Sequence, residues 1–178
     1  MSMDTYFQIL GVEQKWHLAA SELEARYHEK NKLVHPDRHA KADSQTRVRN
    51  ALATSNLNQA YRTLKDPIQR AEYLLKLEGI ELSDERSGHK VAPEFLVEIM
   101  ELREGLMDAR TEGDKAKVSA LAAAVRGRRD AVLGEVDTGF TRYESGDRAV
   151  LGQIADALVA ERYFRRFLDE AEAFLDAE

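Results

Sequence analysis

The hydrophobic positions of this 178-residue chain recur every three to four residues, and every strong periodic pattern is that of a helix. A short helix is expected at residues 5–10, with Asp4 as its cap and Gly11 as its stop. A longer helix is expected to begin at Ser21, because Ser21 and Glu24 have the spacing of a capping box. This second helix should end at the proline that follows it, because the residue before a proline is pushed out of the helical conformation.

Two further helices complete the first part of the chain. Asp43 or Ser44 can cap a third helix, and Pro67 is placed to open a fourth. Gly79 should end that fourth helix, since glycine readily adopts the left-handed conformation that stops helices. The polar and turn-rich stretch at residues 79–92 is the best candidate for a boundary between two domains.

Three longer helical patterns occupy the rest of the chain, at residues 93–111, 115–140 and 147–176. The turns between them are short and contain a glycine stop and an aspartate cap, so neighbouring helices should run antiparallel in a three-helix bundle. The pattern therefore predicts an all-α protein with an N-terminal four-helix domain, a linker and a C-terminal three-helix bundle. Their expected bounds are residues 1–78, 79–92 and 93–178.

Composition narrows the class of protein. Hydrophobic residues make up 43% of the chain and charged residues 33%, as in folded domains. The absence of cysteine excludes disulfides, thiolate nucleophiles, and zinc or iron–sulfur clusters held by cysteine. The sequence has neither the pattern of a signal peptide nor an apolar run long enough to cross a membrane, and we expect a cytoplasmic protein.

The two halves of the chain differ in charge. Residues 1–75 contain 11 lysines and arginines against 9 aspartates and glutamates, whereas residues 76–178 contain 15 against 23. The net charge of −6 is therefore the sum of +2 and −8. The acidic second half argues against binding to nucleic acid, which requires clustered cations. The mildly basic first half suits contact with an acidic protein surface.

The tripeptide His35, Pro36 and Asp37 stands at the expected end of the second helix. A metal site is disfavoured, because Pro36 breaks the helical spacing of His35 and His39 and no third histidine or cysteine is near. No arrangement for nucleophilic catalysis is apparent. A simple helix stop explains the proline but not the polar groups beside it. A contact loop stiffened by proline explains those groups and the basic residues around them.

The order of these features resembles the J-domain family. A short helix ends in ILG, the tripeptide HPD follows a second helix, and the third helix contains NQAYRTLKDP. The resemblance implies a module that stimulates ATP hydrolysis by DnaK-class chaperones, with His35, Pro36 and Asp37 carrying the stimulation. The further implied chaperone contacts are Arg26, His28, Lys30, Lys32 and Arg38. Glu29 dilutes this basic face, and Lys30 stands beside the apolar stripe where the family usually has leucine.

The helix expected at residues 93–111 has two distinct faces. Its inward face carries hydrophobic residues suited to a core, namely Phe95, Ile99, Leu102 and Leu106. Its outward stripe mixes apolar and acidic side chains, namely Val97, Met100, Glu101, Glu104 and Asp108, with Leu96 and Met107 at its edge. The stripe is either a solvated acidic face with two incidental hydrophobic residues or a modest protein interface. In an interface, the hydrophobic side chains supply affinity and the carboxylates supply orientation.

Two segments, PIQRAEYLLKLEGIEL and FLVEIMELREGL, resemble the HscB family of co-chaperones in their amino-acid sequence and in their order along the chain. The resemblance implies an L-shaped protein that stimulates an HscA/DnaK-class ATPase and delivers an IscU-type scaffold to it during iron–sulfur cluster biogenesis. By position, the implied scaffold contacts are Leu96, Val97, Met100, Glu101, Glu104, Asp108 and Tyr163. The resemblance implies no enzyme activity, catalytic residue, metal or cofactor in the chain itself.

Three alternatives to this function stay open at the level of the sequence. They are a J-domain co-chaperone for a different client, a metal-dependent enzyme built on HPDRH, and a structural helical adaptor. The first is the most serious, and the stripe is the feature that separates it from the HscB function.

Several smaller expectations concern single residues. Tyr163 and Phe167 lie away from the hydrophobic face of the last helix, so two alternatives stay open for them: exposure on the surface, which the pattern favours, or packing against the first domain. Trp16 is expected in a core, and the basic run RGRRD at residues 126–130 is expected to be a solvated helix face. Gly105 lies inside a helix, where it should cost about 0.5–1 kcal/mol relative to alanine.

Overall fold

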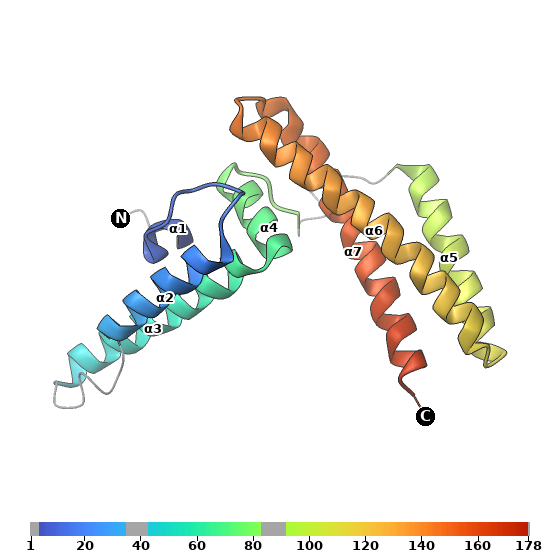
Figure 1. Ribbon diagram of the computed structural model, residues 1–178, viewed down its shortest axis with the longest axis horizontal. Coiled ribbons are helices and arrows are strands. Elements are labelled where there is room, and N and C mark those ends of the chain that lie inside the picture. The colour runs from blue at the N-terminus through green and yellow to red at the C-terminus, as the bar shows by residue number, and fades with distance from the viewer. Residues whose placement is uncertain (1–3, 35–42, 83–91, 178) are drawn as a thin grey trace. The chain divides into compact units, whose positions relative to one another are not determined.

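The computed structural model describes residues 4–34, 43–82 and 92–177, and the regular elements in these ranges are all helices (Figure 1). The chain divides into two compact units, Met1–Leu77 and Glu78–Glu178. The described helices of the first unit are α1 (Tyr6–Leu10), α2 (Ala20–Val34), α3 (Ser44–Lys65) and α4 (Pro67–Leu77). Those of the second are α5 (Pro93–Thr111), α6 (Lys115–Glu144), the 3₁₀ helix η3 (Arg148–Val150) and α7 (Leu151–Leu175). The all-α class predicted from the hydrophobic pattern is confirmed.

The start of α1 differs from the prediction. Thr5, rather than Asp4, is the cap, because its hydroxyl accepts a hydrogen bond from the Gln8 N–H at 3.2 Å. The Gln8 side chain in turn accepts one from the Thr5 N–H at 2.7 Å, which completes a capping box. The predicted stop is confirmed, since Gly11 ends α1 in the left-handed conformation at a φ of 71°.

The start of α2 also differs from the prediction. The helix begins at Ala20, and the carbonyl of Ala19 accepts a hydrogen bond from the Leu23 N–H at 3.1 Å. Ser21 therefore lies inside the first turn and not at the cap position. The capping-box spacing of Ser21 and Glu24 was a local pattern that the chain does not use to start this helix.

The ends of α3 and α4 follow the sequence prediction. The Asp43 carboxylate accepts hydrogen bonds from the backbone N–H and the hydroxyl of Thr46, both at 2.9 Å. These two bonds lower the pKa of Asp43, because they favour its charged form. Pro67 is the first residue of α4, and Gly79 follows that helix at a φ of 83°.

Aromatic side chains join the helices of the first unit. The Tyr6 and Tyr73 rings stack with their centroids 4.3 Å apart, and the Tyr6 N–H donates to the Tyr73 hydroxyl at 3.0 Å. Trp16 is buried, as predicted, and the guanidinium of Arg70 lies 4.9 Å from the centre of its ring. Arg70 is itself buried and donates to the Leu64 carbonyl at 2.9 Å, so a charged group closes this part of the core.

The second unit is a three-helix bundle, in which α6 and α7 pack along one another and α5 lies beside both (Figure 1). Its turns are those predicted, with Gly113 and Gly146 at positive φ and Asp114 and Asp147 as the caps that follow. The bundle core is formed by hydrophobic residues from all three helices, including Ile99, Leu106, Val118, Val125, Phe164, Phe167 and Leu168.

The basic run on α6 is not the plain solvated face that its sequence suggested. Its three arginines reach carboxylates on the two neighbouring helices, in the pairs Arg126–Glu172, Arg128–Glu98 and Arg129–Glu161. The last pair, 3.0 Å apart, is the most enclosed, because Glu161 has no exposed surface. Ion pairs therefore connect α6 to both α5 and α7. The sequence could not show this, since each partner lies at least 30 positions away.

Candidate partner-binding surfaces

Helix α5 presents the two faces expected from its sequence. Ile99 and Leu106 are buried, and Phe95 and Leu102 pack against the same core. The exposed large hydrophobic residues of α5 are Leu96, Val97, Met100 and Met107. A helix packed on one side is normally polar on the other, so this exposed apolar surface is a candidate for protein contact.

The three carboxylates of the stripe, Glu101, Glu104 and Asp108, are all exposed. Within the described part of the chain, none of the three forms an ion pair. Glu98 differs, because it lies on the side of α5 that faces α6 and pairs with Arg128. The negative charge of these three carboxylates is therefore not neutralised by ion pairs within the described part of the bundle.

Helix α7 places one aromatic ring beside α5. The Tyr163 ring meets Phe95 edge-on with the centroids 5.9 Å apart, and it remains 38% exposed. Phe167, however, is only 2% exposed, so the expectation that it is exposed is wrong. The reason is that Phe167 belongs to the core cluster that also contains Ile99 and Leu106. Only the tyrosine of this pair can contribute to a surface on α5 and α7.

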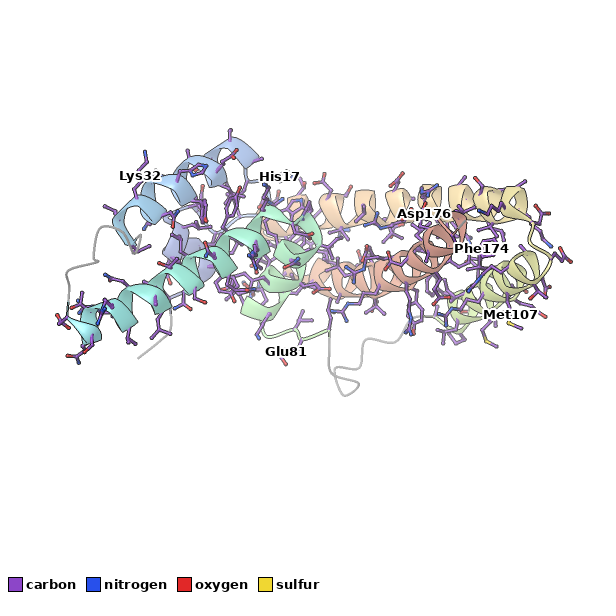
Figure 2. All side chains as sticks on the ribbon, turned by 90° about the horizontal axis from the view of Figure 1, so that it is seen from below. His17, Lys32, Glu81, Met107, Phe174 and Asp176 are labelled. Carbon is purple, nitrogen blue, oxygen red and sulfur yellow. The ribbon has the colours of Figure 1, made fainter. Side chains whose placement is uncertain are left out.

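Met107 belongs with the exposed residues of α5, although the sequence placed it only at the edge of the stripe. Its side chain is 69% exposed, as is that of Met100 seven positions earlier, and it lies near the end of α5 (Figure 2). A spacing of seven residues puts two side chains on the same side of a helix. That spacing was the signal that could have added Met107 to the predicted contacts.

Helix α2 exposes most of the basic residues predicted to bind a chaperone. Arg26, His28 and Lys32 are exposed, and Lys32 is seen on α2 in Figure 2. Arg26 donates to Glu29 at 3.2 Å, and His28 lies 3.9 Å from Glu24. The face is therefore less positive than its basic residues alone would make it, which is the dilution expected from Glu29.

Lys30 lies apart from the other basic residues of α2. It is half-buried, and its Cε and Nζ lie 3.4 Å from the place where a Cβ on Gly11 would stand. A lysine stem covers apolar surface well, and a cation is favoured near the carboxyl end of a helix. Lys30 therefore extends toward the end of α1, which explains how this position accepts a residue other than leucine.

The predicted trigger lies outside the described residues, namely His35, Pro36, Asp37 and the adjoining Arg38. The structure describes the helices on either side of it. Helix α2 ends at Val34, whose carbonyl oxygen lies 3.3 Å from the hydroxyl of Thr54 on α3, and that hydroxyl also donates to the Asn50 carbonyl of α3 at 2.9 Å. The end of α2 therefore contacts α3 immediately before the tripeptide.

The structure also bears on metals and membranes. Among the described residues, no group of three or more His, Asp or Glu side chains is arranged to hold a metal ion. No described helix combines the length and the apolar character needed to span a membrane. The exposed face of α2 and the surface on α5 and α7 are the features of these ranges that match the partner contacts predicted from the sequence.

Comparison with known proteins gives matches to both units. The DnaJ domain family matches residues 5–73, and the HSCB C-terminal oligomerisation domain family matches residues 91–172. The co-chaperone protein HscB homolog of Ralstonia nicotianae is 39% identical over 129 residues, which are 72% of each chain. The mouse iron–sulfur cluster co-chaperone protein HscB is 32% identical, over 89% of this chain and 64% of that protein. The solved structure of the chaperone HscB from Vibrio cholerae has a TM-score of 0.77 at 30% identity and covers 96% of both chains.

The DnaJ domain at residues 5–73 places the chain in the class of J-domain co-chaperones. The sequence identity to the curated relatives then narrows this class to one family. The chain belongs to the HscB family of co-chaperones. The fold class and the family predicted from the sequence are confirmed, whereas the roles of the individual contact residues stay predictions.

Proposed function

We propose that this protein stimulates an HscA/DnaK-class ATPase chaperone and delivers an IscU-type scaffold to it during iron–sulfur cluster biogenesis. Membership of the HscB family and the name of the mouse relative support this function. The first unit would bind the chaperone through the HPD tripeptide and the exposed basic residues of α2. The second unit would bind the scaffold through the stripe on α5 together with Tyr163.

The stripe on α5 is the observation that carries the scaffold half of this proposal. It combines exposed hydrophobic side chains with three carboxylates that form no ion pair in the described part of the chain. Hydrophobic side chains in the middle of a contact supply affinity, and the charges around them select the partner and its orientation. Tyr163 adds an aromatic ring, the kind of residue that interfaces favour.

The mechanism is positioning together with allosteric triggering. One chain that holds both partners makes the encounter between scaffold and chaperone intramolecular, which raises the local concentration of the scaffold at the ATPase. The HPD tripeptide would then bias the chaperone toward its hydrolysing state, and the ATPase would perform the chemistry. We assign no catalytic residue, cofactor or metal to this chain.

Single-turnover ATP hydrolysis tests the proposal directly. An HscA-type chaperone is loaded with ATP, and hydrolysis is measured with this protein added, with and without an IscU-type scaffold. The expected result is stimulation by this protein alone and a further increase when the scaffold is present.

The two other outcomes contradict different parts of the proposal. Stimulation that the scaffold leaves unchanged would indicate a J-domain co-chaperone for a different client. No stimulation of the chaperone, in either condition, would overturn the assignment of the HPD tripeptide as the trigger.

A further inference from the structure

The surface around Tyr163 carries positive as well as negative charge. Arg103 on α5 donates to a carboxylate oxygen of Glu170 on α7 at 2.7 Å. Arg166 on α7 lies 3.8 Å from the same oxygen, which is beyond hydrogen-bond distance, and its side chain is 76% exposed. Glu170 is therefore engaged mainly by Arg103. An exposed contact as long as that of Arg166 contributes little within the protein.

Helical spacing places Arg166 next to Tyr163. Residues three apart lie on the same side of a helix, so Arg166 shares the side of α7 that carries Tyr163. Glu170, four residues further, is on this side too, and its bond to Arg103 shows that the side borders α5. Arg166 therefore stands at the α7 edge of the surface that includes Tyr163.

The carboxylates are concentrated on the other edge of the same surface. Glu98 pairs with Arg128, so its side of α5 faces α6. Glu101 follows Glu98 by three residues, and Asp108 follows Glu101 by seven, which keeps both near that side. Leu96 and Met107 are instead on the α7 side, because they are seven and four residues from Arg103, which reaches Glu170.

We propose that this surface is divided by sign, with the carboxylates of α5 at one edge, Arg166 at the other, and exposed apolar residues between them. The apolar residues are Leu96, Met100, Met107 and Tyr163. The inference rests on the proposed function: the IscU-type scaffold would present cations to α5 and a carboxylate to Arg166. If the scaffold were rotated by half a turn within the plane of the interface, its carboxylate would face the carboxylates of α5 and its cations would face Arg166. The arrangement therefore favours one orientation of the scaffold.

A charge reversal at Arg166 tests this inference, and Arg165 supplies a matched control. Both residues are exposed arginines on α7, and each change to glutamate alters the net charge equally. Arg165 is two residues from Tyr163, which places it on the opposite side of the helix. Titration of the scaffold at low salt should give an affinity about 3- to 10-fold weaker for Arg166→Glu and little change for Arg165→Glu.

Two further measurements distinguish a direct contact of Arg166 from a general effect on charge or stability. Arg166→Lys keeps the charge and should bind within about twofold of the wild type, and the loss in Arg166→Glu should shrink as salt is added. Thermal unfolding followed by circular dichroism should be alike for all three variants, because the substituted side chains are exposed. Lower affinity at equal stability would support a direct contact.

The outcomes separate the inference from the proposed function. If the wild type binds the scaffold and the two reversals have the same effect, Arg166 makes no specific contact and only the inference fails. If the wild type does not bind the scaffold at all, the proposed function fails and the inference falls with it.

Discussion

Asp37 and Asp43 are carboxylates six positions apart, and their expected roles differ in kind. Asp43 accepts two hydrogen bonds from Thr46 and begins α3, so its role is local and structural. Asp37 lies outside the described residues, and the J-domain pattern assigns it to contact with the chaperone. Substitution of Asp43 should therefore change stability, and substitution of Asp37 should change function.

The role of Asp37 can be tested by Asp37→Asn, which keeps the size of the side chain and removes its charge. We expect the stimulation of the chaperone ATPase to fall to near its basal level while scaffold binding stays unchanged. Single-turnover hydrolysis and scaffold titration measure the two properties separately. Stimulation that survives the substitution would remove Asp37 from the trigger.

The cap at Asp43 predicts a pH dependence of stability. Its pKa in the folded protein is lowered from the ordinary value of 3.8 by the two bonds from Thr46, so the carboxylate stabilises the fold above that value. This contribution is lost as the pH falls from 3.8 through the lowered pKa. At neutral pH, Asp43→Ala should unfold at a lower temperature than the wild type, and the difference should shrink in acid.

The control for this prediction is Asp43→Asn. Asparagine caps helices about as well as aspartate but does not titrate in this range. Its thermal midpoint should stay close to the wild type at neutral pH. A gap between the wild type and Asp43→Ala that persists unchanged in acid would contradict a role for the charged cap.

At the scale of the helices, the glycines of the second unit differ in how close the next helix comes. A Cβ on Gly139 of α6 would lie 2.6 Å from Cγ1 of Ile154 on α7, closer than real contacts allow. A Cβ on Gly105 of α5 would lie 3.8 Å from Leu121, which is an ordinary contact. Gly139 is therefore needed for the packing of α6 on α7, whereas Gly105 only weakens its helix.

Alanine substitution should consequently have opposite effects at these two positions. Gly105→Ala should raise the free energy of unfolding by about 0.5–1 kcal/mol, because alanine favours the helix. Gly139→Ala should lower it by about 1–3 kcal/mol, because the clash with Ile154 exceeds that gain. Chemical denaturation with a common slope measures both changes.

Gly134 provides the matched control for these variants. It lies on the same helix as Gly139, and apart from the adjacent residues and backbone of its own helix no atom lies within 4 Å of the place where its Cβ would stand. Gly134→Ala should therefore stabilise the protein as Gly105→Ala does. Equal effects at positions 134 and 139 would contradict the close approach of α6 and α7.

At the scale of the whole molecule, the proposed function needs both binding surfaces on one chain. The exposed basic residues of α2 lie in the first unit, and the stripe on α5 lies in the second. Covalent connection raises the effective concentration of one bound partner at the other, and separate chains lose that advantage.

A mixture of two variants tests this requirement. Asp37→Asn should bind scaffold without stimulating the ATPase, and a chain with both Met100→Ala and Glu104→Ala should stimulate the ATPase but bind scaffold weakly. The mixture should lack the extra stimulation that the scaffold gives with the wild type. Full recovery in the mixture would show that delivery does not depend on a single chain.

Local patterns in the sequence were sufficient to predict where most of the helices begin and end. Pro67, Gly113 and Asp114 act within a few residues of themselves, so their effects could be foreseen. The stripe on α5 was equally local, because helical spacing alone puts Val97 and Glu101, each two residues from Ile99, on the side of the helix away from Ile99. The failures at the starts of α1 and α2 were local too: Thr5, for example, replaces Asp4 as a cap because neighbouring polar residues compete for the same N–H groups.

What the sequence by itself determined is the all-α class, the family and the division of α5 into two faces. These follow from spacing along one helix and from short motifs, which need no knowledge of distant residues. Only the tertiary structure decided that Phe167 is buried, that the arginines of α6 pair with α5 and α7, and that Lys30 extends over the end of α1. Each of these depends on which neighbouring helix faces the side chain, and residues far apart in the chain set that arrangement.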